Sequence, residues 1–230
     1  MSNVKNPPAV IWDMDGVLID SGDLHYYTWR DALGEELGLS LTRSEFDATF
    51  GTDNFNTLAQ FIGRDPSPQE LARLAGRKEA AYREGMRQHV HPIQASMEMV
   101  ERLHERGWKQ IVATSAPREN VLAMMDVFGF DRWFGSYVCV DDVARGKPAP
   151  DIFLKAAERL GAAPGACVVI EDSTAGVQAA RSAGMACLAL LTTHPAESLQ
   201  AADRIVESLA GLTPDDLAAL ANGRDRVKMG

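Results

Sequence analysis

Short apolar segments alternate with amphipathic segments along most of the chain. The apolar runs end in polar residues, and they lie at 9–15, 110–115, 166–172 and 186–193, with weaker examples at 137–143 and 203–206. Such short runs, rich in Val and Ile and without alternation, are typical of parallel strands covered on both faces. The segments between them carry helix start and stop signals, and they lie at 94–106, 117–128, 151–160 and 174–183. This order predicts an α/β fold with a doubly wound, Rossmann-like parallel sheet.

Residues 20–92 follow a different pattern. They contain no convincing strand, but amphipathic helical stretches occur at 24–37, 43–50, 54–62 and 68–88. We therefore predict an all-helical cap domain over 20–92, inserted into an α/β core domain formed by 1–19 and 93–230. The polar tail at 223–230 is expected to fray.

Composition and charge narrow the class of protein. The chain has 230 residues, 46% of them hydrophobic, and a net charge of −9, which argues against nucleic-acid binding. It has no apolar run of the roughly 18 residues that a membrane span needs, and its opening lacks the apolar core of a secretory signal. A cytoplasmic monomer without a membrane partner is the resulting expectation. Cys139, Cys167 and Cys187 lie in apolar runs, which predicts buried, unpaired thiols.

Polar side chains follow the predicted strands at their carboxyl ends, where parallel α/β sheets bind ligands. Asp13 and Asp15 follow the first strand, Thr114-Ser115 the second and Glu171-Asp172 a later one, while Lys147 lies in a Gly- and Pro-rich loop before a helix. Each signal has an ordinary alternative. The DxDG segment can be a turn with solvated acids, Ser115 a helix N-cap, and Lys147 a solvated charge.

The acidic residues have a common requirement if the strand ends meet. The strand ends carry four acids: Asp13, Asp15, Glu171 and Asp172. If they cluster without a nearby cation, their carboxylates repel one another strongly. Carboxylate oxygens without His or Cys favour a hard cation, and Mg²⁺ is the usual partner of phosphate. One such signal at each of four successive strand ends is far more specific than any of the signals singly.

This ordered set resembles the haloacid dehalogenase superfamily. DMDGV is similar to its first motif, TS to its second, the Lys of GKPAPD to its third and EDS to its fourth, with the helical insert in the place of the cap. Within the cap and its approach, several residues resemble the branch that contains β-phosphoglucomutase and small sugar-phosphate phosphatases. These are Asp20-Ser21, His25, Trp29, Arg77-Lys78 and Tyr82.

The resemblance implies a role for each candidate residue. Asp13 is the implied nucleophile that becomes an aspartyl phosphate, and Asp15 is the implied general acid and base. The implied Mg²⁺ ligands are the Asp13 side chain, the Asp15 backbone carbonyl, Glu171 and Asp172. The implied phosphate ligands are Ser115, Lys147 and backbone N–H groups near Gly16 and Ala116.

Two cap residues are candidate substrate contacts. His25 can equally be a packing or helix-surface histidine, and Lys78 a solvated helix charge.

The resulting hypothesis is a Mg²⁺-dependent phosphatase acting on a small phosphorylated metabolite such as a sugar phosphate. A sugar phosphomutase is the nearest alternative, but the cap loop 51–56 lacks the Arg that holds the mutase substrate's second phosphate. A second departure from the branch, Pro92-Ile93 in place of the usual Pro-Gly, is interpreted as structural. A haloacid dehalogenase would not need Glu171 and Asp172. A catalytically idle binding protein would have no reason to retain four repelling acids.

Overall fold

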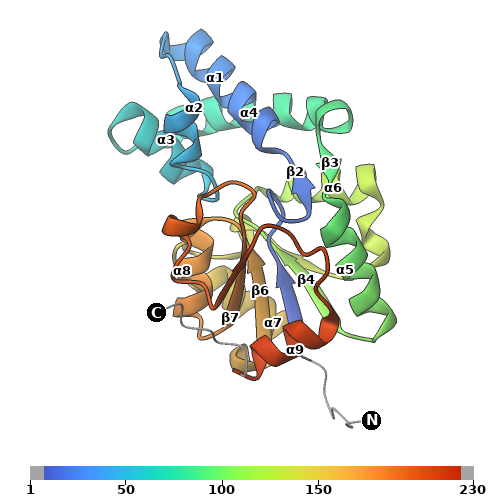
Figure 1. The fold of residues 1–230 in the computed structure, drawn as a ribbon. Coiled ribbons are helices and arrows are strands. Elements are labelled where there is room, and N and C mark those ends of the chain that lie inside the picture. The colour runs from blue at the N-terminus through green and yellow to red at the C-terminus, as the bar shows by residue number, and fades with distance from the viewer. Residues whose placement is uncertain (1–7, 224–230) are drawn as a thin grey trace.

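A twisted parallel sheet forms the centre of the core (Figure 1). The computed structural model describes residues 8–223, and within them the sheet has six strands in the order β5-β4-β1-β6-β7-β8. The strands are β1 Ala9–Trp12, β4 Lys109–Ala113, β5 Tyr137–Val138, β6 Cys167–Glu171, β7 Ala186–Leu190 and β8 Arg204–Val206. All six predicted strands and the predicted fold class are therefore confirmed. The observed strands are shorter than predicted because the polar residues at their ends lie beyond the ladder.

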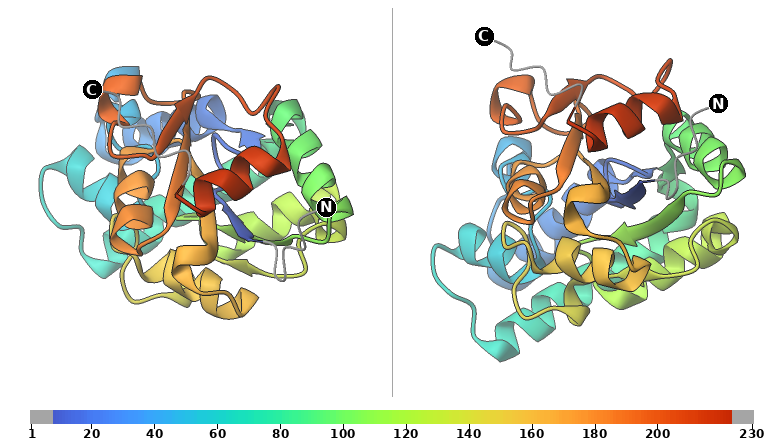
Figure 2. Two further views of the ribbon diagram at one scale, coloured as in Figure 1. Left: turned by 60° about the horizontal axis from the view of Figure 1, so that its bottom comes forward. Right: turned by 90° about the horizontal axis from the view of Figure 1, so that it is seen from below.

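Helices cover both faces of the sheet (Figure 2). They are α5 Gln94–Glu105, α6 Arg118–Phe128, α7 Asp151–Leu160, α8 Thr174–Ser182 and α9 Pro214–Ala221. Alternate side chains of β1 point to opposite faces. Val10 and Trp12 pack with α5, α6 and α9, whereas Ala9 and Ile11 pack with α7 and α8. The continuous apolar run of β1 thus follows from a strand that is buried on both sides.

The segment between β1 and α5 is mostly helical and packs around its own apolar cluster. Its helices are α1 Gly22–Leu37, α2 Arg43–Asp47, α3 Asn54–Ile62 and α4 Pro68–His89. The cluster includes Trp29, Leu33, Phe46, Leu58 and Leu74. Figure 1 shows these helices over one end of the sheet. Because these helices have an apolar cluster of their own, we propose that residues 20–92 form a cap domain and the rest of the chain a core domain.

Two short strands connect the helical segment to the sheet-bearing part. β2 Ile19–Asp20 pairs antiparallel with β3 His91–Pro92. The expectation that 20–92 contains no strand is therefore wrong at both ends of that range. Each strand has only two residues, which is too short to produce a readable period.

Three smaller sequence-based expectations concern thiols, membranes and the tail. Cys139, Cys167 and Cys187 are buried and unpaired, as predicted. No helix in the described part of the chain is long and apolar enough to cross a membrane. The tail from residue 224 onward, expected to fray, lies outside the described residues.

Candidate active site

The register of the sheet brings three polar strand ends together. Trp12 pairs with Val112 of β4 on one side and with Ile170 of β6 on the other. The next residue, Asp13, donates its backbone N–H to the Ile170 carbonyl at 3.0 Å. Asp13 therefore lies between the polar ends of β4 and β6, where the sequence predicts the site.

A compact cluster of acids surrounds one lysine. Carboxylate oxygens of Asp13, Glu171 and Asp172 lie within 4.8 Å of one another, and all three residues are buried. Lys147 Nζ lies 2.6 Å from Asp13 Oδ1 and 2.6 Å from Glu171 Oε1. The lysine is 1% exposed, so the alternative of a solvated loop charge is wrong.

The charges of this cluster are not balanced by the protein alone. Burial raises the pKa of Asp13 to about 7, with Lys147 opposing the shift and Glu171 adding to it. Burial and the neighbouring Glu171 and Asp13 also raise the pKa of Asp172 well above its usual range. Asp172 Oδ1 is buried and has no hydrogen-bond partner among the described residues. A divalent cation fits here, because it would satisfy that oxygen and favour the ionised carboxylates.

Both carboxylate oxygens of Glu171 already accept hydrogen bonds from the protein. Its Oε1 accepts from Lys147, and its Oε2 accepts from the backbone N–H groups of Asp172 and Ser173, each at 2.7 Å. The Ser173 hydroxyl also donates to Oε2 and accepts from Gly176 N–H, which makes Ser173 the N-cap of α8. Glu171 thus fixes the turn that presents Asp172.

Two threonines in the site were not predicted as functional residues. Thr193 Oγ1 donates to Asp172 Oδ2 at 2.5 Å, and Thr192 Oγ1 donates to the Gly16 carbonyl at 2.6 Å. They follow β7, so the strand-end rule applied to that strand would have found them. Gly16 has φ +77°, and a Cβ there would lie 1.9 Å from Asp172 Oδ2, so the close approach of these two segments requires glycine.

Asp15 points away from the acid cluster, toward the cap. Its Oδ1 accepts hydrogen bonds from Ser21 Oγ at 2.6 Å and Tyr82 Oη at 3.2 Å, and it lies 3.0 Å from His25 Nε2. Burial opposes its charge, but His25, Ser21 and the charge of Lys78 together hold the pKa of Asp15 below its usual value. In this arrangement Asp15 is a carboxylate able to accept a proton.

The two cap candidates form a chain that leads to Asp15. Lys78 Nζ lies 2.7 Å from His25 Nδ1 and 2.9 Å from Glu79 Oε1. Because an ammonium group can only donate, His25 accepts at Nδ1 and donates from Nε2 to Asp15. The His25 ring stacks on Tyr82 with centroids 4.0 Å apart. Lys78 is 2% exposed, so the alternative of a solvated helix charge is wrong.

The predicted phosphate ligands Ser115, Ala116 and Gly16 each donate a hydrogen bond to another protein group. Ser115 Oγ donates to the Gly51 carbonyl of the cap loop at 2.9 Å, and α6 has Pro117 as its N-cap, so the N-cap interpretation of Ser115 is wrong. The N–H of Ala116 donates to Thr114 Oγ1, and that of Gly16 donates to the Ile19 carbonyl. Neither N–H is free to bind phosphate in this arrangement.

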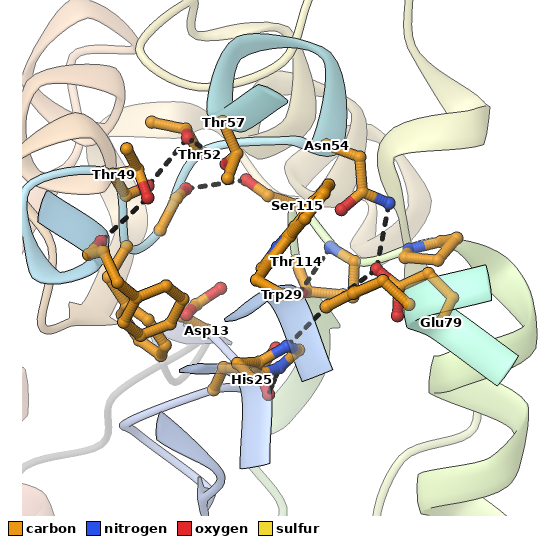
Figure 3. Close-up of a pocket in the computed structure, with 17 residues that line it drawn as sticks. Asp13, His25, Trp29, Thr49, Thr52, Asn54, Thr57, Glu79, Thr114 and Ser115 are labelled. Atoms are coloured by element: carbon orange, nitrogen blue, oxygen red, sulfur yellow. Dashed lines mark hydrogen bonds and ion pairs between the residues drawn. The ribbon is translucent and has the colours of Figure 1, made fainter. Parts of the chain in front are cut away.

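A pocket lies between the cap helices and the strand ends (Figure 3). Asp13, Asp15 and Ser115 line its core side, and His25 and Lys78 are among the residues that line its cap side. Aromatic and threonine side chains complete the cap wall: Trp29, Phe46, Phe50, Thr49, Thr52 and Thr57. The nucleophile, acid–base and substrate-contact candidates therefore share one cavity, and Asp13 is the member of the acid cluster that lines it.

A parallel sheet of this order, with paired acids and a lysine at its strand ends, is the arrangement of a hydrolase with an α/β fold. The family model of the haloacid dehalogenase-like hydrolases matches residues 10–190. The chain belongs to this family.

The chain is also similar to individual proteins and to solved structures. The chloroplastic protein Suppressor of Quenching 1 from Arabidopsis thaliana is 34% identical over 96% of this chain, but this chain spans only 21% of that protein. Fructose-1-phosphate phosphatase YqaB from Escherichia coli K12 is 33% identical, over 77% of this chain and 93% of its own length. Among solved structures, a family IA haloacid dehalogenase hydrolase from Entamoeba histolytica superposes with a TM-score of 0.85 at 25% identity, covering 94% of this chain and 99% of its own.

Proposed function

We propose that this chain is a Mg²⁺-dependent phosphatase that hydrolyses a small phosphorylated metabolite through an aspartyl phosphate on Asp13. The observation that carries the proposal is the buried cluster of Asp13, Glu171 and Asp172, in which Lys147 binds Asp13 and Asp172 Oδ1 has no hydrogen-bond partner among the described residues. Family membership and a phosphatase relative point to the same chemistry. Phosphoryl transfer requires in-line positioning and neutralisation of negative charge, and the cluster supports the second requirement because it can hold a cation beside Asp13.

Four groups are proposed to hold the cation. The Asp13 side chain, the free oxygen of Asp172 and the Asp15 backbone carbonyl would bind it directly, and Glu171 would contribute as far as its bond to Lys147 allows. A bound Mg²⁺ supplies charge neutralisation at the transferring phosphoryl group. Lys147 would bind the remaining phosphoryl oxygens, and Ser115 would join it once its hydroxyl leaves the Gly51 carbonyl of the cap loop.

The covalent steps are assigned to the two aspartates. An Asp13 carboxylate oxygen forms a bond to phosphorus while the bond to the leaving oxygen breaks, and Asp15 gives that oxygen a proton. Water then attacks the aspartyl phosphate, the bond between phosphorus and the Asp13 oxygen breaks, and Asp15 takes the proton of the attacking water. Phosphate leaves and Asp13 is regenerated.

The contacts of Asp15 fit the second step directly. Three donors stabilise its ionised form, which is the form that accepts a proton from water. For the first step Asp15 must carry a proton, so substrate binding must change these contacts. Because His25 and Tyr82 belong to the cap, movement of the cap would be the means of changing them.

The proposed substrate is a phosphorylated sugar or a similar polyol. Threonine hydroxyls and Asn54 line the cap wall and can bind hydroxyl groups, and aromatic rings can contact the faces of a sugar ring. The test is a phosphate-release screen over sugar phosphates, nucleotides and other phosphorylated metabolites, with and without Mg²⁺. Release from no compound at any Mg²⁺ concentration would contradict the proposal.

A further inference from the structure

A second buried carboxylate, Glu79 on α4, lines the same pocket but has no part in the proposed chemistry. It is 5% exposed and lies on the cap side. Figure 3 shows it across the pocket from Thr49, with Asp13 between the two in the view. A negative charge at this position faces whatever part of the substrate lies beyond the reacting phosphate.

Three donors hold Glu79 in its ionised form. Lys78 Nζ and Asn54 Nδ2 each donate to Oε1 at 2.9 Å, and Asn120 Nδ2 donates to Oε2 at 2.6 Å. Burial opposes the charge, but the charge of Lys78 and the hydrogen bonds from Lys78 and Asn120 outweigh it, so the pKa of Glu79 is below its usual value. Glu79 is therefore an anion at neutral pH.

No cation on this side of the pocket is left to bind a second anionic group. Lys78 is the one Lys or Arg among the described residues that line the pocket, and Glu79 pairs with it. Lys78 also donates to His25 and lies 5.2 Å from the Tyr82 ring centroid and 5.6 Å from that of Trp29. A distal phosphate would find no free cation here and would lie beside a carboxylate whose charge Lys78 already balances, whereas a hydroxyl could donate a hydrogen bond to that carboxylate.

We infer that Glu79 is a specificity-determining residue that excludes substrates with a second phosphate and favours monophosphates whose distal end is neutral and hydroxylated. The inference rests on the proposed phosphatase function for the identity of the reacting phosphate. The preference for a monophosphate over a bisphosphate is nevertheless a property of ligand binding. The two dissociation constants can therefore be measured without any turnover.

The experiment compares two probes that differ by one phosphate, fructose 1-phosphate and fructose 1,6-bisphosphate. Their dissociation constants are measured by calorimetry with Mg²⁺ in an Asp13→Asn background, and phosphate release is measured in parallel with Asp13 intact. Glu79→Gln removes the charge with little change of shape and releases Lys78. Asn54→Lys, at a partly exposed position, neutralises Glu79 if the first variant fails to fold. Glu84→Gln, exposed on the same helix, is the matched control.

The expected result is a shift of the affinity ratio toward the bisphosphate by about tenfold or more in Glu79→Gln and in Asn54→Lys, with no shift in Glu84→Gln. A purely structural role would weaken both probes equally. A ratio unchanged in both folded variants, or failure of every form to bind either probe, would overturn the inference. If the ratio shifts but no compound is hydrolysed, the specificity role stands and the phosphatase proposal fails.

Discussion

The unpaired oxygen of Asp172 leads to a prediction about metal dependence. Activity should be lost on chelation and restored by Mg²⁺, and Ca²⁺ should substitute poorly because it relaxes the octahedral geometry. Asp172→Ala removes the buried oxygen and should lower Mg²⁺-dependent turnover by at least about 100-fold. The measurement is turnover against free Mg²⁺ concentration, with Asp215→Ala, at the exposed side chain of Asp215, as the control. An enzyme indifferent to chelator would contradict the site.

Asp13 leads to a prediction that separates chemistry from folding. Asp13→Asn keeps the size of the side chain but removes the nucleophilic oxygen, so turnover should fall by more than about 1,000-fold. Burial raises the pKa of Asp13 to about 7, so a neutral amide is tolerated there and the fold should remain intact. Phosphate release and thermal unfolding measure the two effects. Turnover within tenfold of the wild type would rule out Asp13 as the nucleophile.

At the scale of elements, Asp142 joins three segments. Its carboxylate accepts from Arg118 at the start of α6 at 2.8 Å, from Arg159 near the end of α7 at 3.0 Å, and from the Cys139 N–H at 3.0 Å. Burial acts to raise its pKa, but these donors hold the pKa well below its usual value. A carboxylate with a depressed pKa stabilises the fold above its unfolded pKa of about 3.9. That contribution is lost as the pH falls toward the folded value.

We therefore expect Asp142→Asn to lower the free energy of unfolding by about 1–2 kcal/mol at pH 7, because the amide keeps only part of these charge-assisted bonds. The difference from the wild type should shrink as the pH falls below about 4. Urea unfolding at both pH values measures it, with the exposed Glu158→Gln as the control. A constant difference across this range would mean that the Asp142 charge is not what joins these elements.

The regular elements were predictable from the sequence because burial produces their patterns. β1 is apolar throughout because helices cover both its faces, and α7 ends at Gly161 because its C-cap is left-handed. The prediction omitted α9, although its first turn carries start signals, namely the capping box of Thr213 and Asp216 and the proline at Pro214. β2 and β3 left no pattern, because pairing of two residues is decided by tertiary structure.

The part of the site that could be predicted consists of polar residues that follow the carboxyl ends of the strands. Asp13, Glu171, Asp172 and Lys147 meet as expected because parallel strands end at one edge. The partners of Asp15 were not predictable in this way. Ser21 and His25 lie at the start of α1 and Tyr82 lies on α4, and only the packing of α1 against α4 brings them to one oxygen. Glu79 was missed for the same reason, since a helical Glu is usually solvated.

At the scale of the whole molecule, polar groups of the cap and the core form hydrogen bonds with one another. Ser115 of the core donates to the Gly51 carbonyl of the cap loop. Asn120 of α6 donates to Glu79 and accepts from Arg83, which are both on α4. Asn120 is fully buried, so these bonds exist only while the cap lies against the core. The same cap position that encloses the pocket therefore also holds Glu79 in place.

The last prediction distinguishes a phosphatase from a phosphomutase. A mutase must hold a sugar bisphosphate by both ends, and its distal phosphate normally requires a fixed cation, above all Arg. The cap loop 51–56 instead offers Asp53, whose carboxylate accepts from Asn56. Arg64 and Lys78 are the cap cations considered as replacements for that Arg, and both are paired: Arg64 donates to Glu70 in an exposed pair, and Lys78 donates to Glu79.

We therefore expect hydrolysis of a monophosphate, with little conversion of β-glucose 1-phosphate to glucose 6-phosphate. The measurement is a coupled assay for glucose 6-phosphate, primed with glucose 1,6-bisphosphate and run beside free-phosphate detection. With Glu79 ionised in the pocket, the primer should bind poorly and phosphate release should exceed isomerisation. If isomerisation is faster than phosphate release, the chain is a mutase, and a cation other than the absent loop Arg must hold the distal phosphate.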